Sequence, residues 1–241
     1  MVYGKNEAIM TRGLAILSMI ILHLFCRLGN DIMYTPLIWV TDTKPLMYYF
    51  GFFAEICVPL YSLCVGYAQF LLYERQKLGY VYTGKRVFKL LKTYWIILFL
   101  FCGLGMFFDT DQIIPGTFPL FLESIVLLHS YNGAWWYLNS YIILLLVPAF
   151  IIMEPIKRIN SFLGVIFFLL LSFLWYVWGK FNFFSFVEMQ FFMPYREFYN
   201  FMHILPYIGI GAILCKSRAF DRGEVIINKS ERILEFSARD N

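Results

Sequence analysis

Residues 11–25 read TRGLAILSMIILHLF, a largely apolar run whose only ionisable side chains are Arg12 and His23. An α-helix advances about 100° per residue, so the eleven-residue step between them makes almost three turns. Both side chains return to one face, roughly 16 Å apart along the axis. If this helix crosses a membrane, Arg12 lies near water and His23 lies inside the hydrocarbon, where ionisable groups are costly and usually functional. The stretch therefore predicts a transmembrane helix whose aligned cation and imidazole suit a long anionic ligand.

The composition of the whole chain places it in the same class. Of its 241 residues, 60% are hydrophobic, 21% are aromatic and only 15% are charged, whereas soluble domains are roughly half apolar. Apolar runs that can cross a bilayer, which takes about 20 residues per helix, fill most of the chain up to Cys215. We expect an all-α, polytopic transmembrane helix bundle, with an integral membrane domain over residues 1–216 and a polar cytoplasmic tail over residues 217–241. No feature indicates a nucleic-acid partner.

Hydropathy predicts six spans, at residues 10–28, 48–72, 93–108, 135–153, 162–178 and 199–215. Residues 117–129 are also apolar, but they are few and include Glu123, so a short re-entrant or interfacial segment is expected there. In this arrangement, four of the 20 basic residues lie on the side opposite both termini: Arg27, Lys44, Lys180 and Arg196. Because basic residues concentrate in cytoplasmic loops, both termini are predicted to be cytoplasmic.

The five cysteines lie in or beside apolar segments, at Cys26, Cys57, Cys64, Cys102 and Cys215. None shows the paired spacing of metal ligands, so we interpret them as small apolar packing residues. We expect neither a disulfide framework nor a bound metal.

A basic cluster precedes the third span, where residues 73–95 read YERQKLGYVYTGKRVFKLLKTYW. A helix through this segment puts Arg86 and Lys89, three residues apart, on one face, with Lys85 and Lys92 beside them near the membrane surface. Such a cluster suits phosphate groups. A second interpretation stays open, in which these side chains only anchor the helix at lipid headgroups and set the topology.

A cytoplasmic donor with phosphates and a long flexible arm fits this layout, and coenzyme A has that form. Its phosphates would bind Arg12, Arg86 and Lys89, while its pantetheine arm is comparable in length to the roughly 16 Å between Arg12 and His23. The thioester would then reach His23. A neutral imidazole there either takes the proton of an attacking sugar hydroxyl or accepts the acyl group itself, and both mechanisms stay open.

These motifs resemble those of the integral-membrane acyltransferase-3 family, the bacterial surface-glycan O-acetyltransferases. The first span of that family carries an arginine or lysine, ten residues and then a histidine, as Arg12 and His23 stand here in the context RGLAIL. Its third span begins with Arg-x-x-Arg, and KRVFK supplies Arg86 and Lys89. Two further stretches resemble family patterns in the second and fourth spans: VPLYSLCVGY at residues 58–67 and AWWYLNSYIILLLVP at residues 134–148.

The resemblance implies transfer of an acyl group, most often acetyl, from cytoplasmic acetyl-CoA to a hydroxyl of a surface polysaccharide or its lipid-linked precursor, in the bacterial inner membrane. It implies that Arg12 and His23 are essential and that Arg86 and Lys89 bind the donor. Glu55, a carboxyl within an apolar span, is a third catalytic candidate that orients His23 or contacts the acceptor; a packing role is the alternative. Acyl-CoA, the sugar acceptor and membrane lipid are the expected partners.

The number of spans differs from the family pattern, because the family usually has about ten spans and this chain offers six. A minimal acyltransferase and a shortened, inactive member are both consistent with that difference. The rival from another class is a non-enzymatic subunit for glycan or lipid export, which would use the same basic cluster for anionic headgroups.

Overall fold

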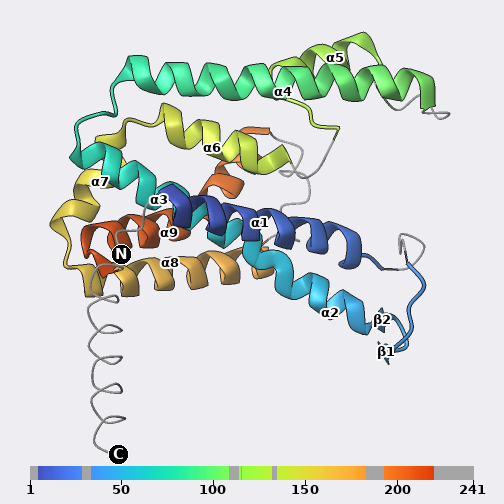
Figure 1. Cartoon of the computed structure of the whole chain (residues 1–241), viewed down its shortest axis with the longest axis horizontal. Helices are drawn as coiled ribbons and strands as arrows, with labels where there is room; N and C mark the ends of the chain where they lie inside the picture. Colours follow the sequence, from blue (N-terminus) through green and yellow to red (C-terminus); the bar gives the residue numbers. More distant parts are fainter. Residues whose placement is uncertain are drawn as a thin grey trace, which may run out of the picture. The chain divides into compact units, whose positions relative to one another are not determined.

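The computed structural model describes residues 5–28, 34–108, 114, 116–131, 135–182 and 193–219. Apart from a short antiparallel hairpin of β1 (Trp39–Thr41) and β2 (Lys44–Pro45), these residues form helices joined by turns (Figure 1). The helices are α1 (Lys5–Phe25), α2 (Leu46–Phe53), the 3₁₀ turn η2 (Ala54–Ile56), α3 (Cys57–Glu74), α4 (Tyr80–Phe108), α5 (Phe118–Ile125), α6 (Trp136–Leu146), α7 (Ala149–Arg158), α8 (Ser161–Asn182) and α9 (Met193–Lys216). Most of the predicted tail, residues 217–241, lies outside the described residues.

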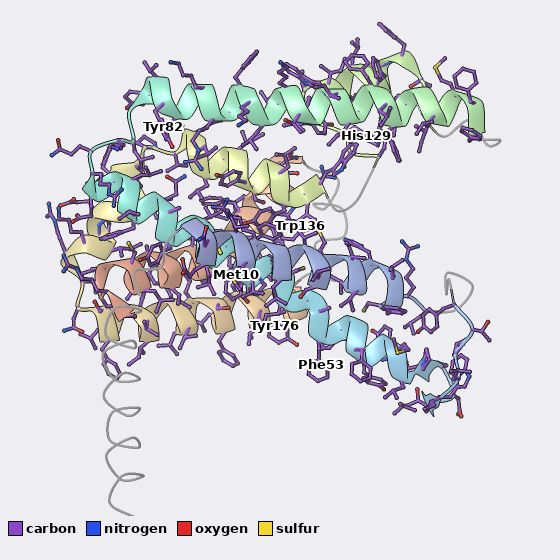
Figure 2. All side chains as sticks on the ribbon, in the orientation of Figure 1. Met10, Phe53, Tyr82, His129, Trp136 and Tyr176 are labelled. Atoms are coloured by element: carbon purple, nitrogen blue, oxygen red, sulfur yellow. The ribbon has the colours of Figure 1, made fainter. Side chains whose placement is uncertain are left out.

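Helices long and apolar enough to cross a membrane confirm the predicted all-α polytopic bundle. In the described part of the chain they are Asn6–Phe25, Leu46–Glu74, Tyr80–Phe108, Ser161–Trp178 and Arg196–Lys216, and a bent pair adds a sixth if it counts as one span. Large apolar side chains on their outer surfaces are exposed, as Met10 at 74% and Phe53 at 78% illustrate (Figure 2). Lipid tails solvate such side chains, so the protein is a multi-pass membrane protein.

The fourth predicted span, over residues 135–153, is bent in the structure. α6 ends at Leu146, α7 begins at Ala149, and the two helices are bent by 78°. The cause is Pro148, which has no N–H to donate and disfavours helical geometry in the residue before it. Val147 accordingly adopts an extended conformation, with φ −65° and ψ 128°. The predicted span over residues 135–153 is therefore a bent pair of helices, which is either one broken span or a re-entrant loop.

The third predicted span is longer than hydropathy suggests, because α4 begins at Tyr80 rather than near residue 93. Its 29 residues correspond to about 43 Å, whereas the hydrocarbon core is about 30 Å thick. Lysine and arginine are good helix formers, so the helix continues through the basic cluster. Arg86 and Lys89 thus lie on a rigid helical extension.

The chain forms two compact units. The first unit comprises Met1–Leu71, Met153–Leu170 and Ile204–Asn241, and the second comprises Leu72–Ile152 and Leu171–His203. The first unit therefore contains Arg12, His23 and Glu55, whereas the second contains Arg86 and Lys89.

Glycines bring two helices of the first unit into backbone contact. A Cβ added to Gly66 of α3 would lie 2.0 Å from the carbonyl oxygen of Ile208 in α9. In the opposite direction, a Cβ added to Gly211 of α9 would lie 2.2 Å from the carbonyl oxygen of Leu63 in α3. Small residues at helix crossings allow this approach, which in membranes supplies the van der Waals contact that holds helices together.

The second unit attaches the short helix α5 to α4. The Tyr94 hydroxyl donates to the carbonyl of Ser124 at 2.7 Å, and the Trp95 indole donates to the carbonyl of Ile125 at 2.9 Å. The last carbonyls of a helix lack partners within it, so these two side chains satisfy the end of α5. With eight residues, α5 is too short to cross the membrane, as predicted for residues 117–129.

Replacing Tyr94 with phenylalanine is expected to destabilise the folded protein by about 0.5–1.5 kcal/mol, the net worth of one hydrogen bond, because the Ser124 carbonyl keeps a second hydrogen bond from the Leu127 N–H. The Tyr94 side chain is 4% exposed, so removal of its hydroxyl takes away a buried hydrogen bond to the Ser124 carbonyl. The thermal unfolding of the detergent-solubilised protein measures the effect. Tyr80→Phe is the matched control, because Tyr80 lies on the same helix and is 83% exposed. Equal melting temperatures for both variants would contradict the assigned role of this hydrogen bond.

Candidate functional site

Arg12 and His23 lie on the same face of α1, because the helix runs unbroken from Lys5 to Phe25. The packed stripe of the helix is marked by the buried residues Ala15 and Ser18, whereas Arg12 and His23 are both exposed. At about 100° per residue, they lie about a quarter of a turn from that stripe. Ionisable side chains on a spanning helix do not stably face hydrocarbon. This exposed stripe of α1 therefore suits a ligand or a hydrated cavity.

The two ends of the stripe have different surroundings within the first unit. The charge of Arg12 acts on the hydroxyl of Tyr61 in α3, which places these groups near one another. At the other end, the His23 carbonyl accepts a hydrogen bond from Arg27 Nε at 2.8 Å. No hydrogen bond or ion pair to a described residue engages the His23 imidazole. A role for the His23 imidazole in proton transfer stays a prediction.

Glu55 lies in the 3₁₀ turn η2, near the end of α1 that carries His23. The turn forms because Pro59 lacks the N–H that would bond to the Glu55 carbonyl in a regular α-helix. α2 approaches α1 closely before this turn, since a Cβ on Gly51 would lie 2.6 Å from the backbone nitrogen of Cys26. The Glu55 carboxylate acts electrostatically on the Cys26 thiol. Among the described residues, however, no hydrogen bond or ion pair joins Glu55 to His23, so the orienting role stays a prediction.

In the second unit, two tyrosines hold the guanidinium of Arg86, and we call Tyr82 and Tyr141 the tyrosine cradle. Arg86 Nη2 donates to the Tyr141 hydroxyl at 2.5 Å. The guanidinium carbon lies 5.7 Å from the ring centre of Tyr82 and 5.9 Å from that of Tyr141, within cation–π range. Arg86 Nη1 is buried and has no hydrogen-bond partner among the described residues.

A buried charged N–H group without an acceptor is unfavourable, which makes Arg86 Nη1 a candidate to receive an anion. Lys85, Lys89 and Lys92 are exposed on the same helix and add positive charge around it. Arg86 and Lys89 are three residues apart in the unbroken α4 and share a face, as predicted. Arg12 belongs to the other unit, so joint binding of one ligand by Arg12, Arg86 and Lys89 stays a prediction.

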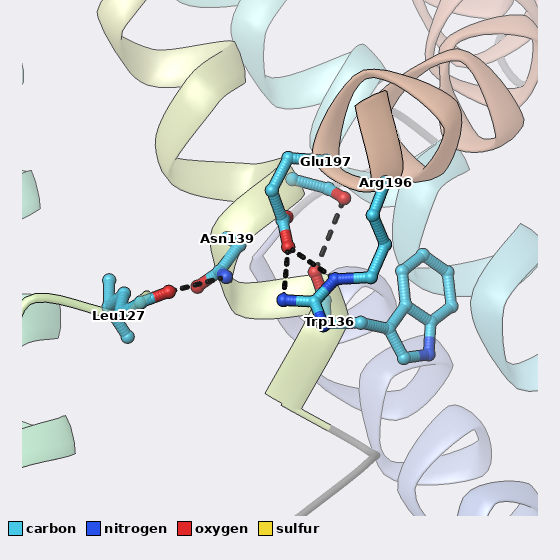
Figure 3. A network of polar contacts seen from close by, with 6 residues as sticks. Leu127, Trp136, Asn139, Arg196 and Glu197 are labelled. Atoms are coloured by element: carbon cyan, nitrogen blue, oxygen red, sulfur yellow. Dashed lines mark hydrogen bonds and ion pairs between the residues drawn. The ribbon is translucent and has the colours of Figure 1, made fainter. Parts of the chain in front are cut away.

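The second unit contains a further set of polar contacts, shown in Figure 3, that was not predicted from the sequence. Arg196 Nη2 and Glu197 Oε1 of α9 form an ion pair at 3.3 Å, and Asn139 Nδ2 of α6 donates to the carbonyl of Leu127 at 3.2 Å. Glu197 Oε2 and Asn139 Oδ1 are buried acceptors without a partner in the described part of the chain. Acceptors of this kind suit donors such as hydroxyl groups.

Sequence reasoning missed Tyr82 and Tyr141, although both lie in quoted motifs. Arg86 and Tyr141 are 55 residues apart, and no local periodicity connects positions so distant in the chain. One signal was available, since an arginine near an apolar span needs polar or aromatic partners, and tyrosine supplies both. In the described segments, no group of three or more His, Cys, Asp and Glu residues is arranged to hold a metal ion.

Comparison with known proteins gives one family match. The model of the acyltransferase-3 family, described as an acyltransferase domain, matches residues 8–234. No curated protein and no solved structure matches the chain. The family match covers most of the sequence and includes the stripe of α1, the tyrosine cradle and the basic residues of α4. The chain therefore belongs to the acyltransferase-3 family and is a membrane acyltransferase.

Proposed function

We propose that the protein transfers an acyl group, most often acetyl, from cytoplasmic acyl-CoA to a hydroxyl of a cell-surface polysaccharide or its lipid-linked precursor. In this proposal it lies in the bacterial inner membrane with both termini in the cytoplasm. The observation that carries the donor assignment is the buried, unpartnered Nη1 of Arg86 among exposed lysines. A charged donor in that setting calls for an anionic ligand, and the phosphates of coenzyme A supply one.

The donor binds through its phosphates at Arg86 and Lys89, and Arg12 adds a further cationic contact. Lysine at position 89 contributes a point charge, whereas arginine would offer a planar fork that engages two phosphate oxygens. The pantetheine arm then extends along the exposed stripe of α1. The helical separation of Arg12 and His23, roughly 16 Å, is comparable to the length of that arm and brings the thioester to His23.

At His23, a neutral imidazole nitrogen takes the proton from the acceptor hydroxyl. The hydroxyl oxygen forms a bond to the thioester carbonyl carbon, the carbon–sulfur bond breaks, and the thiolate leaves and is protonated as free coenzyme A. In the covalent variant, the imidazole nitrogen forms a bond to the thioester carbonyl carbon, and the carbon–sulfur bond breaks to release the thiolate. The sugar hydroxyl oxygen then takes the acyl group from the nitrogen, which leaves a neutral imidazole, and the proton of the hydroxyl passes to the thiolate or to water. Both routes need an imidazole nitrogen without another partner, which the described surroundings of His23 provide.

Transfer of label in inverted membrane vesicles tests the proposal. Vesicles that contain the protein and its acceptor receive radiolabelled acetyl-CoA from the cytoplasmic face, and the extracted glycan or lipid-linked sugar is counted. We expect label in the acceptor, and we expect Arg86→Gln to raise the KM for acetyl-CoA at least about tenfold, because it removes a charge-assisted phosphate contact.

Two results would contradict the proposal and point to the alternatives. Movement of sugar across the vesicle membrane without any acyl donor would indicate an export subunit. Binding of coenzyme A without any transfer of label, with the acceptor demonstrably present, would indicate an inactive member of the family.

Lys77→Gln serves as the matched control for Arg86→Gln, because it removes a charge on the same side of the predicted topology but outside α4.

A further inference from the structure

The tyrosine cradle determines how Arg86 presents its guanidinium. A guanidinium is planar and carries its N–H groups in a fixed fork. In the structure, the Tyr141 hydroxyl accepts from Nη2, and both rings lie within cation–π range of the guanidinium carbon. These contacts restrict rotation of the side chain and leave Nη1 without a partner among the described residues.

The two tyrosines differ in what they contribute. Tyr82 lies one helical turn before Arg86 on α4 and is 41% exposed; its ring contacts the guanidinium, and its hydroxyl forms no hydrogen bond with another described residue. Tyr141 comes from α6, is partly buried, and adds the hydrogen bond to Nη2. Because it joins a different helix to Arg86, it fixes the direction of the guanidinium.

We propose that Tyr141 is a positioning residue for donor binding, which holds Arg86 so that Nη1 meets a phosphate oxygen of coenzyme A. This inference rests on the proposed function, and it adds to it a residue that acts through Arg86 rather than on the ligand itself. An arginine held in place loses less conformational entropy when the ligand binds than a mobile one does. The hydroxyl of Tyr141 therefore contributes to affinity for the phosphate-bearing donor.

The test uses the full-length protein in lipid nanodiscs and two donors, acetyl-CoA and S-acetylpantetheine, which lacks the nucleotide and its phosphates. Tyr141→Phe keeps the ring and removes the hydroxyl. We expect it to weaken equilibrium binding of coenzyme A and to raise the KM for acetyl-CoA about tenfold, with kcat unchanged. The KM for S-acetylpantetheine is expected to stay unchanged, because that donor has no phosphate for Arg86 to bind.

Tyr80→Phe is the matched control, since it also removes a tyrosine hydroxyl from α4 but lies outside the tyrosine cradle and is 83% exposed. We expect it to bind coenzyme A as the parent protein does. A double-mutant cycle gives the second readout. If Tyr141 acts through Arg86, Tyr141→Phe has no further effect on coenzyme A binding once Arg86 is replaced by glutamine.

Two results separate failure of this inference from failure of the proposed function. If Arg86→Gln weakens coenzyme A binding and Tyr141→Phe does not, the positioning role is wrong and the donor assignment stands. If the parent protein binds no coenzyme A, the donor assignment is wrong and the inference falls with it. An equal rise in KM for both donors in Tyr141→Phe would show a general structural effect and would also overturn the positioning role.

Discussion

Replacement of His23 with alanine is expected to lower the rate of acyl transfer at least about a hundredfold, because positioned proton transfer typically contributes that much or more. The folded protein is expected to survive the change. The His23 side chain is exposed, and its imidazole makes no hydrogen bond or ion pair with the described residues. Initial rates at saturating acetyl-CoA, together with thermal unfolding of the same preparations, measure both effects.

The matched control for this experiment is Leu17→Ala. Leu17 lies between Arg12 and His23 in the sequence of α1, is also exposed, and is about a third of a turn away from the stripe that carries Arg12 and His23. Its truncation removes apolar surface without removing a titratable group, so the rate is expected to stay within about twofold of the parent. A parent-like rate for His23→Ala, in a variant that is present and folded, would contradict a catalytic role for His23.

Replacement of Gly66 with valine is expected to have the largest effect on stability, more than about 3 kcal/mol, because it forces apart two backbones that are already in contact. The nearest atom to an added Cβ is the carbonyl oxygen of Ile208, at 2.0 Å, which belongs to a helix and cannot rotate away. The fraction of protein that elutes as a folded species from size-exclusion chromatography in detergent, together with its melting temperature, measures the loss.

Gly103→Val provides the comparison for this prediction. Gly103 also lies within a spanning helix, α4, but an added Cβ there meets no atom within 4 Å. We expect that variant to fold with a nearly unchanged melting temperature. If Gly66→Val were as stable as Gly103→Val, the close contact between α3 and α9 would not be a feature of the folded protein.

The elements that the sequence predicted well are those that hydropathy governs. The α1 helix and the shared face of Arg12 and His23 follow from one apolar run and the geometry of a helix. The short helix α5 follows from a run that is too brief to span. Pro148 indicated a break in the fourth span, because proline ends helices. Hydropathy alone extends that span to residue 153, because the residues on both sides of Pro148 are apolar.

The contacts that join separate segments were not predictable in this way. Arg86 with Tyr141 and Gly66 with Ile208 each join residues that are far apart in the sequence. Hydrophobic periodicity reports which face of a helix is buried, but it does not report which helix covers that face. The family match extends to residue 234, well beyond the motifs quoted up to residue 148. It therefore includes α8 and α9, whose sequences read as little more than apolar runs.

O-acetylation of the host cell's surface polysaccharide is the most direct measure of acyl transfer by this protein. Proton NMR would measure the O-acetyl signals in polysaccharide from cells with the intact gene, from cells without it, and from cells that carry His23→Ala at a matched level of protein. We expect the signal to be present in the first strain and lost in the other two. An unchanged signal in cells without the gene, under conditions where the intact strain produces the protein, would contradict acyl transfer by this chain to that polysaccharide.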